Sequence, residues 1–142
     1  MAFLDVSGAF DNVRCDILLR KLSSIGCSEN LVRFIHFLTY SREIFTDSLD
    51  NEYRTIGKGV PQGEVLSPLL YLIYVKDITS GISRNVTVSQ FADDTAVYCN
   101  IASLKKCKKA LEKAINNIQK NISELGLQFA PHKTVFIHFN KL

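Results

Sequence analysis

The feature that most limits the fold is a one-sided apolar stripe in the last third of the sequence. Its residues recur every three or four positions, which is the period of an amphipathic helix. They are Leu104, Cys107, Leu111, Ile115, Ile118, Ile122 and Leu125. Ser103 stands where such a helix starts and Gly126 where it stops. The spacing therefore predicts one long helix over residues 104–125, with its lysines off the apolar stripe.

The first half of the sequence predicts a strand followed by two shorter helices. The strand covers Ala2 to Val6. A helix with apolar residues at helical spacing follows Asp11 and ends at Gly26. Ser28 is a suitable N-cap for the second helix. Its apolar face carries Leu31, Phe34, Ile35 and Leu38.

The other predicted elements are three strand pairs and a further helix. The strands are expected at residues 43–47, 52–56, 86–91, 95–99, 128–129 and 135–139. The first pair flanks the turn-rich stretch SLDN, the second forms a hairpin with Asp93 and Asp94 at its turn, and the third flanks APHKT. A helix is expected from Ser67-Pro68, a good cap and first-turn pair, to about Asp77.

This mixed order of elements predicts an α+β fold with an antiparallel sheet, because regular strand–helix alternation is absent. A length of 142 residues suits one domain over residues 1–142. The hydrophobic fraction of 46% and the charged fraction of 22% are typical of an ordinary globular protein.

Charge and cysteine usage limit the possible partners only loosely. The net charge of +3 permits a nucleic-acid partner without arguing for one. We interpret the lysine cluster as a solvated helix face: Lys105, Lys106, Lys108, Lys109 and Lys113. The four cysteines lack CxxC spacing and no signal peptide precedes them, so free thiols in an intracellular protein of the nucleus or cytoplasm are expected. The longest apolar stretch is too short to span a bilayer, so no membrane partner is expected.

Adjacent carboxylates interrupt an apolar, strand-like run at Asp93 and Asp94. Burying even one such charge costs several kcal/mol, roughly, unless it is paired or metal-bound. Alone, this pair fits an ordinary turn, and Asp5 at the end of the first strand fits a cap or a surface charge. Together, three carboxylates on two strands of one sheet suit a pair of Mg²⁺ ions, with Mn²⁺ as an alternative.

Two further stretches carry residues of interest. In GVPQG, Gln62 offers a donor and an acceptor to a sugar or base, and Gly63 lets a ligand approach the backbone. A plain loop before a helix explains this stretch equally well. In APHKT, Lys133 is either simply exposed or a general acid for a departing phosphate, a role that His132 would share.

Four ordered blocks carry a resemblance to a known family: AFLDVSGAFDNV, GVPQGEVLSPLLYLIY, QFADDTAVY and GLQFAPHKTVFIHF. They resemble the successive palm motifs of reverse transcriptases, most closely those of non-LTR retrotransposons. The resemblance implies a right-hand polymerase palm, in which an antiparallel sheet carries the aspartates and helices pack on one face of it. Such a palm extends a DNA primer on an RNA template, using deoxynucleoside triphosphates and two Mg²⁺ ions. The chain would then be a palm fragment with fingers and thumb truncated and no endonuclease segment, and with little activity alone.

The resemblance also implies a role for each matched residue. Asp5 and Asp93 correspond to metal-binding aspartates and Asp94 to their acidic neighbour. Phe10 falls where the family has a bulky steric gate that excludes a ribose 2′-OH, and core packing is its alternative role. Asp11 is expected to cap the next helix. Gln62 and Gly63 match residues near the incoming nucleotide, and Lys133 the residue proposed to protonate pyrophosphate.

Glu64 departs from the family pattern, because many relatives carry a small or hydroxyl residue after PQG. A carboxylate there either weakens nucleic-acid binding or favours the helix that follows, through the helix dipole. Two other interpretations of the chain stay open. One is a non-catalytic nucleic-acid-binding remnant of a retroelement, and the other is the palm of a group II intron maturase.

Overall fold

The computed structural model describes residues 1–40, 42–45 and 53–139. Contacts divide the chain into two compact units. The first unit combines Met1–Ala9 with Val75–Leu142, and the second is Phe10–Tyr74. The single domain predicted over residues 1–142 stays a prediction. No helix in the described ranges is long and apolar enough to cross a membrane.

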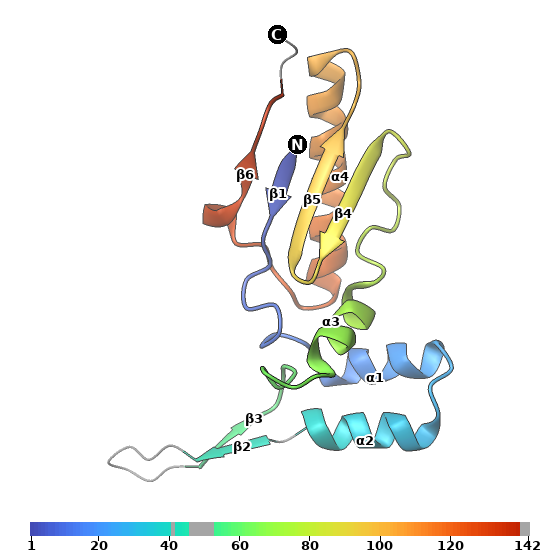
Figure 1. The fold of residues 1–142 in the computed structure, drawn as a ribbon, viewed down its shortest axis with the longest axis vertical. Helices are drawn as coiled ribbons and strands as arrows, with labels where there is room; N and C mark the ends of the chain where they lie inside the picture. Colours follow the sequence, from blue (N-terminus) through green and yellow to red (C-terminus); the bar gives the residue numbers. More distant parts are fainter. Residues whose placement is uncertain (41, 46–52, 140–142) are drawn as a thin grey trace. The chain divides into compact units, whose positions relative to one another are not determined.

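An antiparallel four-stranded sheet forms the first unit, with one long helix against it (Figure 1). The strand order is β4-β5-β1-β6. The elements are β1 (Ala2–Leu4), β4 (Val86–Phe91), β5 (Asp94–Cys99), α4 (Leu104–Glu124) and β6 (Val135–Phe136). This arrangement confirms the predicted α+β fold with an antiparallel sheet.

The core of the first unit lies between this sheet and α4. The buried residues of α4 are Leu111, Ala114, Ile118 and Ile122, all from the predicted stripe or adjacent to it in helical projection. Alternation along the strands supplies the opposite side, since Ala2, Leu4 and Val97 are buried whereas Phe3 is exposed. The helix begins after Ser103 and is followed by Gly126 at a φ of 78°, as predicted.

The last strand pair was predicted wrongly. Val135 and Phe136 pair with β1 and not with residues 128–129. Phe129 instead forms an isolated bridge with Val6. A 3-10 turn, η1 (Pro131–Lys133), separates the two stretches, so both flank the N-terminal strand rather than each other. Pairing between distant segments prevailed over the local hairpin.

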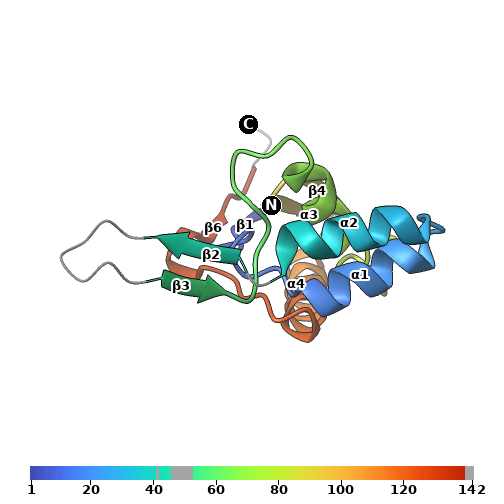
Figure 2. The same cartoon turned by 90° about the horizontal axis from the view of Figure 1, so that it is seen from below.

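The second unit contains α1 (Cys15–Ser24), α2 (Glu29–Thr39), β2 (Arg42–Phe45), β3 (Tyr53–Ile56) and all of α3 (Ser67–Val75) except its last residue. Helices α1 and α2 pack side by side (Figure 2). The Ser28 hydroxyl caps α2 by accepting a hydrogen bond from the Leu31 amide, as predicted. Strands β2 and β3 pair antiparallel, and the SLDN turn predicted between them lies outside the described residues.

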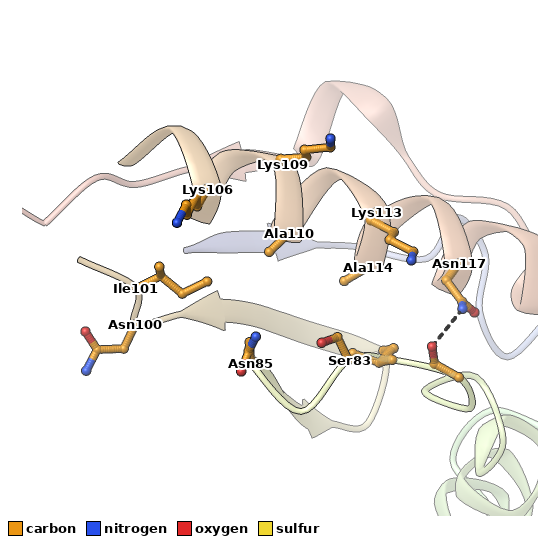
Figure 3. A pocket seen from close by; sticks show the side chains of 12 residues that line it. Ser83, Asn85, Asn100, Ile101, Lys106, Lys109, Ala110, Lys113, Ala114 and Asn117 are labelled. Carbon is orange, nitrogen blue, oxygen red and sulfur yellow. Dashed lines mark hydrogen bonds between the residues drawn. The ribbon is translucent and has the colours of Figure 1, made fainter. Parts of the chain in front are cut away.

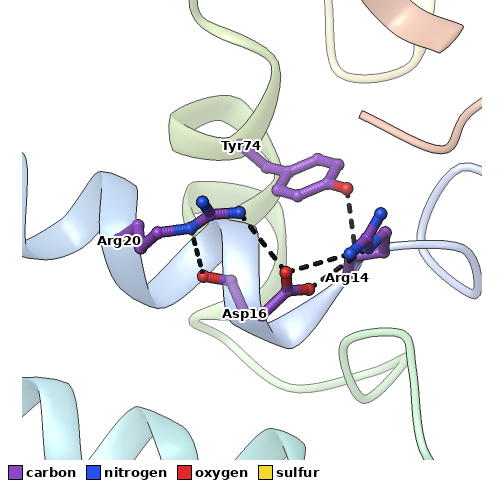
Figure 4. Close-up of polar contacts among 4 residues, drawn as sticks. All are labelled: Arg14, Asp16, Arg20 and Tyr74. Atoms are coloured by element: carbon purple, nitrogen blue, oxygen red, sulfur yellow. Dashed lines mark hydrogen bonds and ion pairs between the residues drawn. The ribbon is translucent and has the colours of Figure 1, made fainter. Parts of the chain in front are cut away.

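The start of α1 differs from the prediction. Arg14 occupies the N-cap position, with extended backbone and no side-chain cap, so Asp11 does not cap this helix. The Arg14 guanidinium instead bonds Asp16, which also accepts from Arg20, and the Arg14 amide donates to the Tyr74 hydroxyl (Figure 4). The hydrogen bond from Arg14 lowers the pKa of Asp16, and burial raises the pKa of Tyr74.

Candidate active site

The predicted hairpin brings two carboxylates to its turn. Strands β4 and β5 pair in register from Val86↔Cys99 to Phe91↔Asp94, which leaves Ala92 and Asp93 as the turn. Ala92 has a φ of 52°, in the left-handed region that few residues other than glycine adopt. Asp93 is half-buried and Asp94 exposed. The turn therefore presents both aspartates at one end of the sheet.

Asp5 lies beside this turn. Leu4 pairs with Thr95, so the antiparallel register sets Asp5, one residue further, alongside Asp94. Alternation turns Asp5 to the same side as the exposed Phe3, away from the buried Leu4. The carbonyl of Asp5 accepts a 2.9 Å hydrogen bond from the Ala130 amide, which anchors the end of the strand. The sheet thus brings together carboxylates that are far apart in sequence.

Lys133 completes this cluster. Its ammonium lies 2.8 Å from the Asp5 carboxylate, in a pair whose side chains are 58% and 23% exposed, respectively. By accepting this hydrogen bond, Asp5 raises the pKa of Lys133, and the charges of Asp5, Asp93 and Asp94 add to the rise. Four predicted site residues therefore share one electrostatic environment in the first unit.

The chemistry of these donors fits a divalent cation, although their present arrangement is not a finished metal site. Over the described residues, no three His, Cys, Asp or Glu side chains are gathered closely enough to hold a metal ion. The oxygens of Asp5, Asp93 and Asp94 are nevertheless the hard ligands that Mg²⁺ prefers. Their combined field already holds one cation, the Lys133 ammonium. That ammonium occupies a position at Asp5 where a metal ion would compete.

In the second unit, Phe10 lies against Tyr71, with ring centroids 4.9 Å apart and planes tilted by 32°. Its carbonyl accepts a 2.9 Å hydrogen bond from the Val60 amide, and the Gly59 amide donates to the Val13 carbonyl at 2.7 Å. The block that contains Phe10 therefore runs beside GVPQG. The packing against Tyr71 accords with the alternative role of Phe10, and its gate role stays a prediction.

Gln62 joins the same pair of blocks. Its side-chain amide donates a 2.8 Å hydrogen bond to the Asp11 carboxylate. Gly63 has a φ of 91°, and nothing lies within 4 Å of where a Cβ would project. Glu64 is exposed and precedes α3, which begins at Ser67. Phe10, Gln62 and Gly63 are thus neighbours within the second unit, and Glu64 stands outside the helix.

Sequence reasoning missed two residues that hold this region together. Asp11 is the partner of Gln62 rather than a helix cap. Gly59 has a φ of 87°, and a Cβ there would lie 2.9 Å from the Asp11 carbonyl oxygen. The glycine pair of GVPQG was a signal for Gly59, but only the neighbouring backbone of Asp11 shows why a side chain is excluded there.

Comparisons with known proteins place the chain in a family. Residues 1–141 match the family described as reverse transcriptase (RNA-dependent DNA polymerase). The RNA-directed DNA polymerase from mobile element jockey of Drosophila melanogaster is 29% identical over 145 residues, which cover 97% of this chain and 16% of that protein. The jockey protein of Drosophila funebris is 31% identical over 126 residues, covering 83% of this chain and 14% of that protein.

The fold also resembles solved structures. The telomerase from Candida albicans, solved with the TWJ fragment of telomeric RNA, aligns with a TM-score of 0.69 at 12% identity. The alignment covers 99% of this chain and 27% of that one. This likeness confirms the predicted fold of a right-hand polymerase palm. The chain spans only 16% and 14% of the two jockey proteins that it matches.

Proposed function

The chain belongs to the reverse transcriptase family, and we propose that it provides the palm of an RNA-directed DNA polymerase from a non-LTR retrotransposon. Its substrates would be an RNA template, a DNA primer with a free 3′-OH and deoxynucleoside triphosphates, all available inside a cell. The observation that carries this proposal is the cluster of Asp5, Asp93 and Asp94 around the Lys133 ammonium.

Asp5, Asp93 and Asp94 would hold two Mg²⁺ ions, with Mn²⁺ as a substitute. Bound metal of this kind supplies an activated attacking hydroxyl and neutralises the leaving group. The contribution of the chain is to hold three carboxylates at one end of a rigid sheet, where the repulsion between neighbouring aspartates is offset by cations. That arrangement explains why two adjacent acids are tolerated at a tight turn.

Lys133 would act after it leaves Asp5. Its ammonium would then be a donor for the phosphate oxygens of departing pyrophosphate, and we propose it as the general acid. A lysine ammonium is protonated at neutral pH without a carboxylate beside it. The hydrogen bond to Asp5 raises the pKa of Lys133 further for as long as the pair lasts.

In the second unit, Phe10, Gln62 and Gly63 are proposed to contact the incoming nucleotide. The Phe10 ring would exclude a ribose 2′-OH and so select deoxyribose, and its contact with Tyr71 would hold the ring in place. The Gln62 amide, now bonded to Asp11, offers polar contacts to the sugar. The open space at Gly63 leaves room for a ligand close to the backbone.

Replacement of one metal ligand tests the proposal. In a complete enzyme that contains these residues, Asp93→Asn should lower RNA-templated primer extension by about 1000-fold, since metal coordination contributes several kcal/mol, roughly, to such steps. Glu112→Gln, which removes the same charge from an exposed position on α4, is the matched control and should retain activity. Unchanged extension by the Asp93→Asn enzyme would contradict the assignment.

A further inference from the structure

We propose that the first unit carries a second nucleic-acid site, a groove along α4 that binds the phosphodiester backbone of a single strand. This goes beyond the proposed polymerase site and uses none of its residues. The groove has a volume of about 750 Å³ and lies between α4 and the segments that flank β4 and β5 (Figure 3). We call it the lysine groove, after Lys106, Lys109 and Lys113, which line it.

The three lysines line the groove along α4. Their spacing of three and four residues places them on successive turns of one helix face. Within the described part of the chain, none of them pairs with a carboxylate. Their neighbour Lys108, by contrast, lies 4.0 Å from Glu112, and Lys120 lies 4.0 Å from Glu124. The groove therefore collects three α4 lysines without a paired carboxylate among the described residues, and Lys105, outside the groove, is a fourth.

The opposite wall mixes apolar and neutral hydrogen-bonding side chains, since Ile82 and Ile101 lie beside the polar residues there. Asn85 and Asn100 line it from just outside the paired ends of β4 and β5 (Figure 3). One end of the groove is closed by Asn117, whose amide donates a 3.2 Å hydrogen bond to the carbonyl of Gly81. Gly81 has a φ of 79°, and a Cβ there would approach the Asn117 amide to 3.0 Å. This end is thus shaped by the close approach of helix and loop.

This chemistry suits a nucleic-acid backbone better than a protein partner. From Lys106 to Lys113 the helix rises about 10 Å, enough to meet more than one phosphate of a strand. Among the described lining residues none is aromatic and none is arginine, although those types dominate protein interfaces and base stacking. The site would bind through charge and amide contacts, without selecting a base sequence.

The lysine groove is separate from the candidate active site. Asn85 and Asn100 adjoin the Val86↔Cys99 pair, at the end of the β4–β5 hairpin opposite the turn with Asp93. Six paired positions separate the two ends, a length of about 17 Å. A nucleotide bound at the aspartates would not fill the groove, so the two sites can be tested independently.

The test is binding of a labelled 20-nucleotide oligouridylate to the 142-residue chain, followed by fluorescence anisotropy across a salt series. The groove variant carries Lys106→Gln, Lys109→Gln and Lys113→Gln. The control carries Lys105→Gln, Lys108→Gln and Lys120→Gln, which removes the same charge from the same helix outside the groove. Circular dichroism of both variants verifies that α4 is retained.

Loss of three phosphate contacts should flatten the slope of log affinity against log salt by about 2 in the groove variant, and by much less in the control. At low salt the groove variant should bind at least about tenfold more weakly than the control. Equal losses in both variants, or none in either, would refute a dedicated groove.

One further measurement separates this proposal from a protein-binding site. Polyglutamate of equal charge should compete at least about tenfold less well than oligouridylate. Equal competition would mean that the groove takes an acidic protein segment, which would overturn the nucleic-acid assignment.

Discussion

The two groups of candidate site residues are held in different ways. In the first unit, the Lys133 ammonium pairs with Asp5, and the charges of Asp93 and Asp94 also act on it, so charge organises the group. In the second unit, Phe10 is fixed by a ring contact and by a backbone hydrogen bond from Val60. A charged cluster can exchange one cation for another, whereas a closely packed backbone tolerates little added side-chain volume. The first group is therefore expected to respond to ions and the second to changes in volume.

Gly59→Ala should produce the largest loss of stability, because it adds volume to the packed region. The new Cβ would meet the Asp11 carbonyl oxygen at 2.9 Å, on a backbone with a φ of 87°. We expect the free energy of unfolding to fall by about 2–4 kcal/mol in urea titrations. Gly57→Ala is the control, since nothing lies within 4 Å of its Cβ position. Equal effects at the two glycines would show that the packing argument is wrong.

Ala92→Gly changes the turn of the charged region, and here we expect a gain. The left-handed φ of 52° costs an alanine about 1–2 kcal/mol, and a glycine avoids this cost. Part of that gain is lost, because glycine makes the unfolded chain more flexible. The net stabilisation should be about 0.5–1 kcal/mol, measured by the same titration. Ala102→Gly, at a position without a positive φ, should destabilise slightly. Destabilisation by Ala92→Gly would mean that the turn is not strained.

Lys133→Gln tests whether the charged group exchanges its cation. Without the competing ammonium, the aspartates should bind Mn²⁺ roughly two- to fivefold more tightly in calorimetric titrations, as expected for loss of an exposed ion pair. Gln62→Ala, in the packed group, should leave Mn²⁺ affinity unchanged. Weaker Mn²⁺ binding by the Lys133→Gln chain would indicate that the lysine supports the site and does not compete for it.

The smallest effect is expected at Asp16, an exposed ion pair within the packed unit. Because Arg14 lowers the pKa of Asp16 below its ordinary 3.8, the pair stabilises the fold fully above that value. Its contribution is lost as the pH falls through the lowered pKa. Asp16→Asn should therefore cost below about 1 kcal/mol at pH 7, and the stabilities of the two proteins should converge as the pH falls through the lowered pKa of Asp16. A constant difference across this range would exclude the ion pair as the cause.

Local patterns predicted the elements well and their partners less well. The period of α4 and the turn at Asp93 depend on neighbouring residues, and both were predicted correctly from the sequence. The partner of Val135 is Phe3, far away in the chain, and no local pattern indicates such pairing. Asp11 was misassigned for the same reason, because its bond to Gln62 joins distant blocks.

The candidate site followed the same rule. Chemistry and family resemblance indicated Asp5, Asp93, Asp94 and Lys133, and the structure gathers these four in one unit. The ion pair between Asp5 and Lys133 could not be read from spacing, since it depends on the return of the C-terminal segment to β1. The steric requirement at Gly59 likewise exists only once the Asp11 backbone lies beside it.

The discontinuity of the first unit has a consequence for how the chain folds. Residues 10–74 form one unbroken unit, whereas β1 must close a loop of most of the chain before it can pair with β5 and β6. Long-range strand pairing is slow, because the entropy of closing such a loop is lost before any contact compensates. During synthesis on a ribosome, residues 10–74 would be available to fold before β5 and β6, the strands that pair with β1, have been made. The N-terminal strand that carries Asp5 is therefore expected to be among the last elements to become ordered.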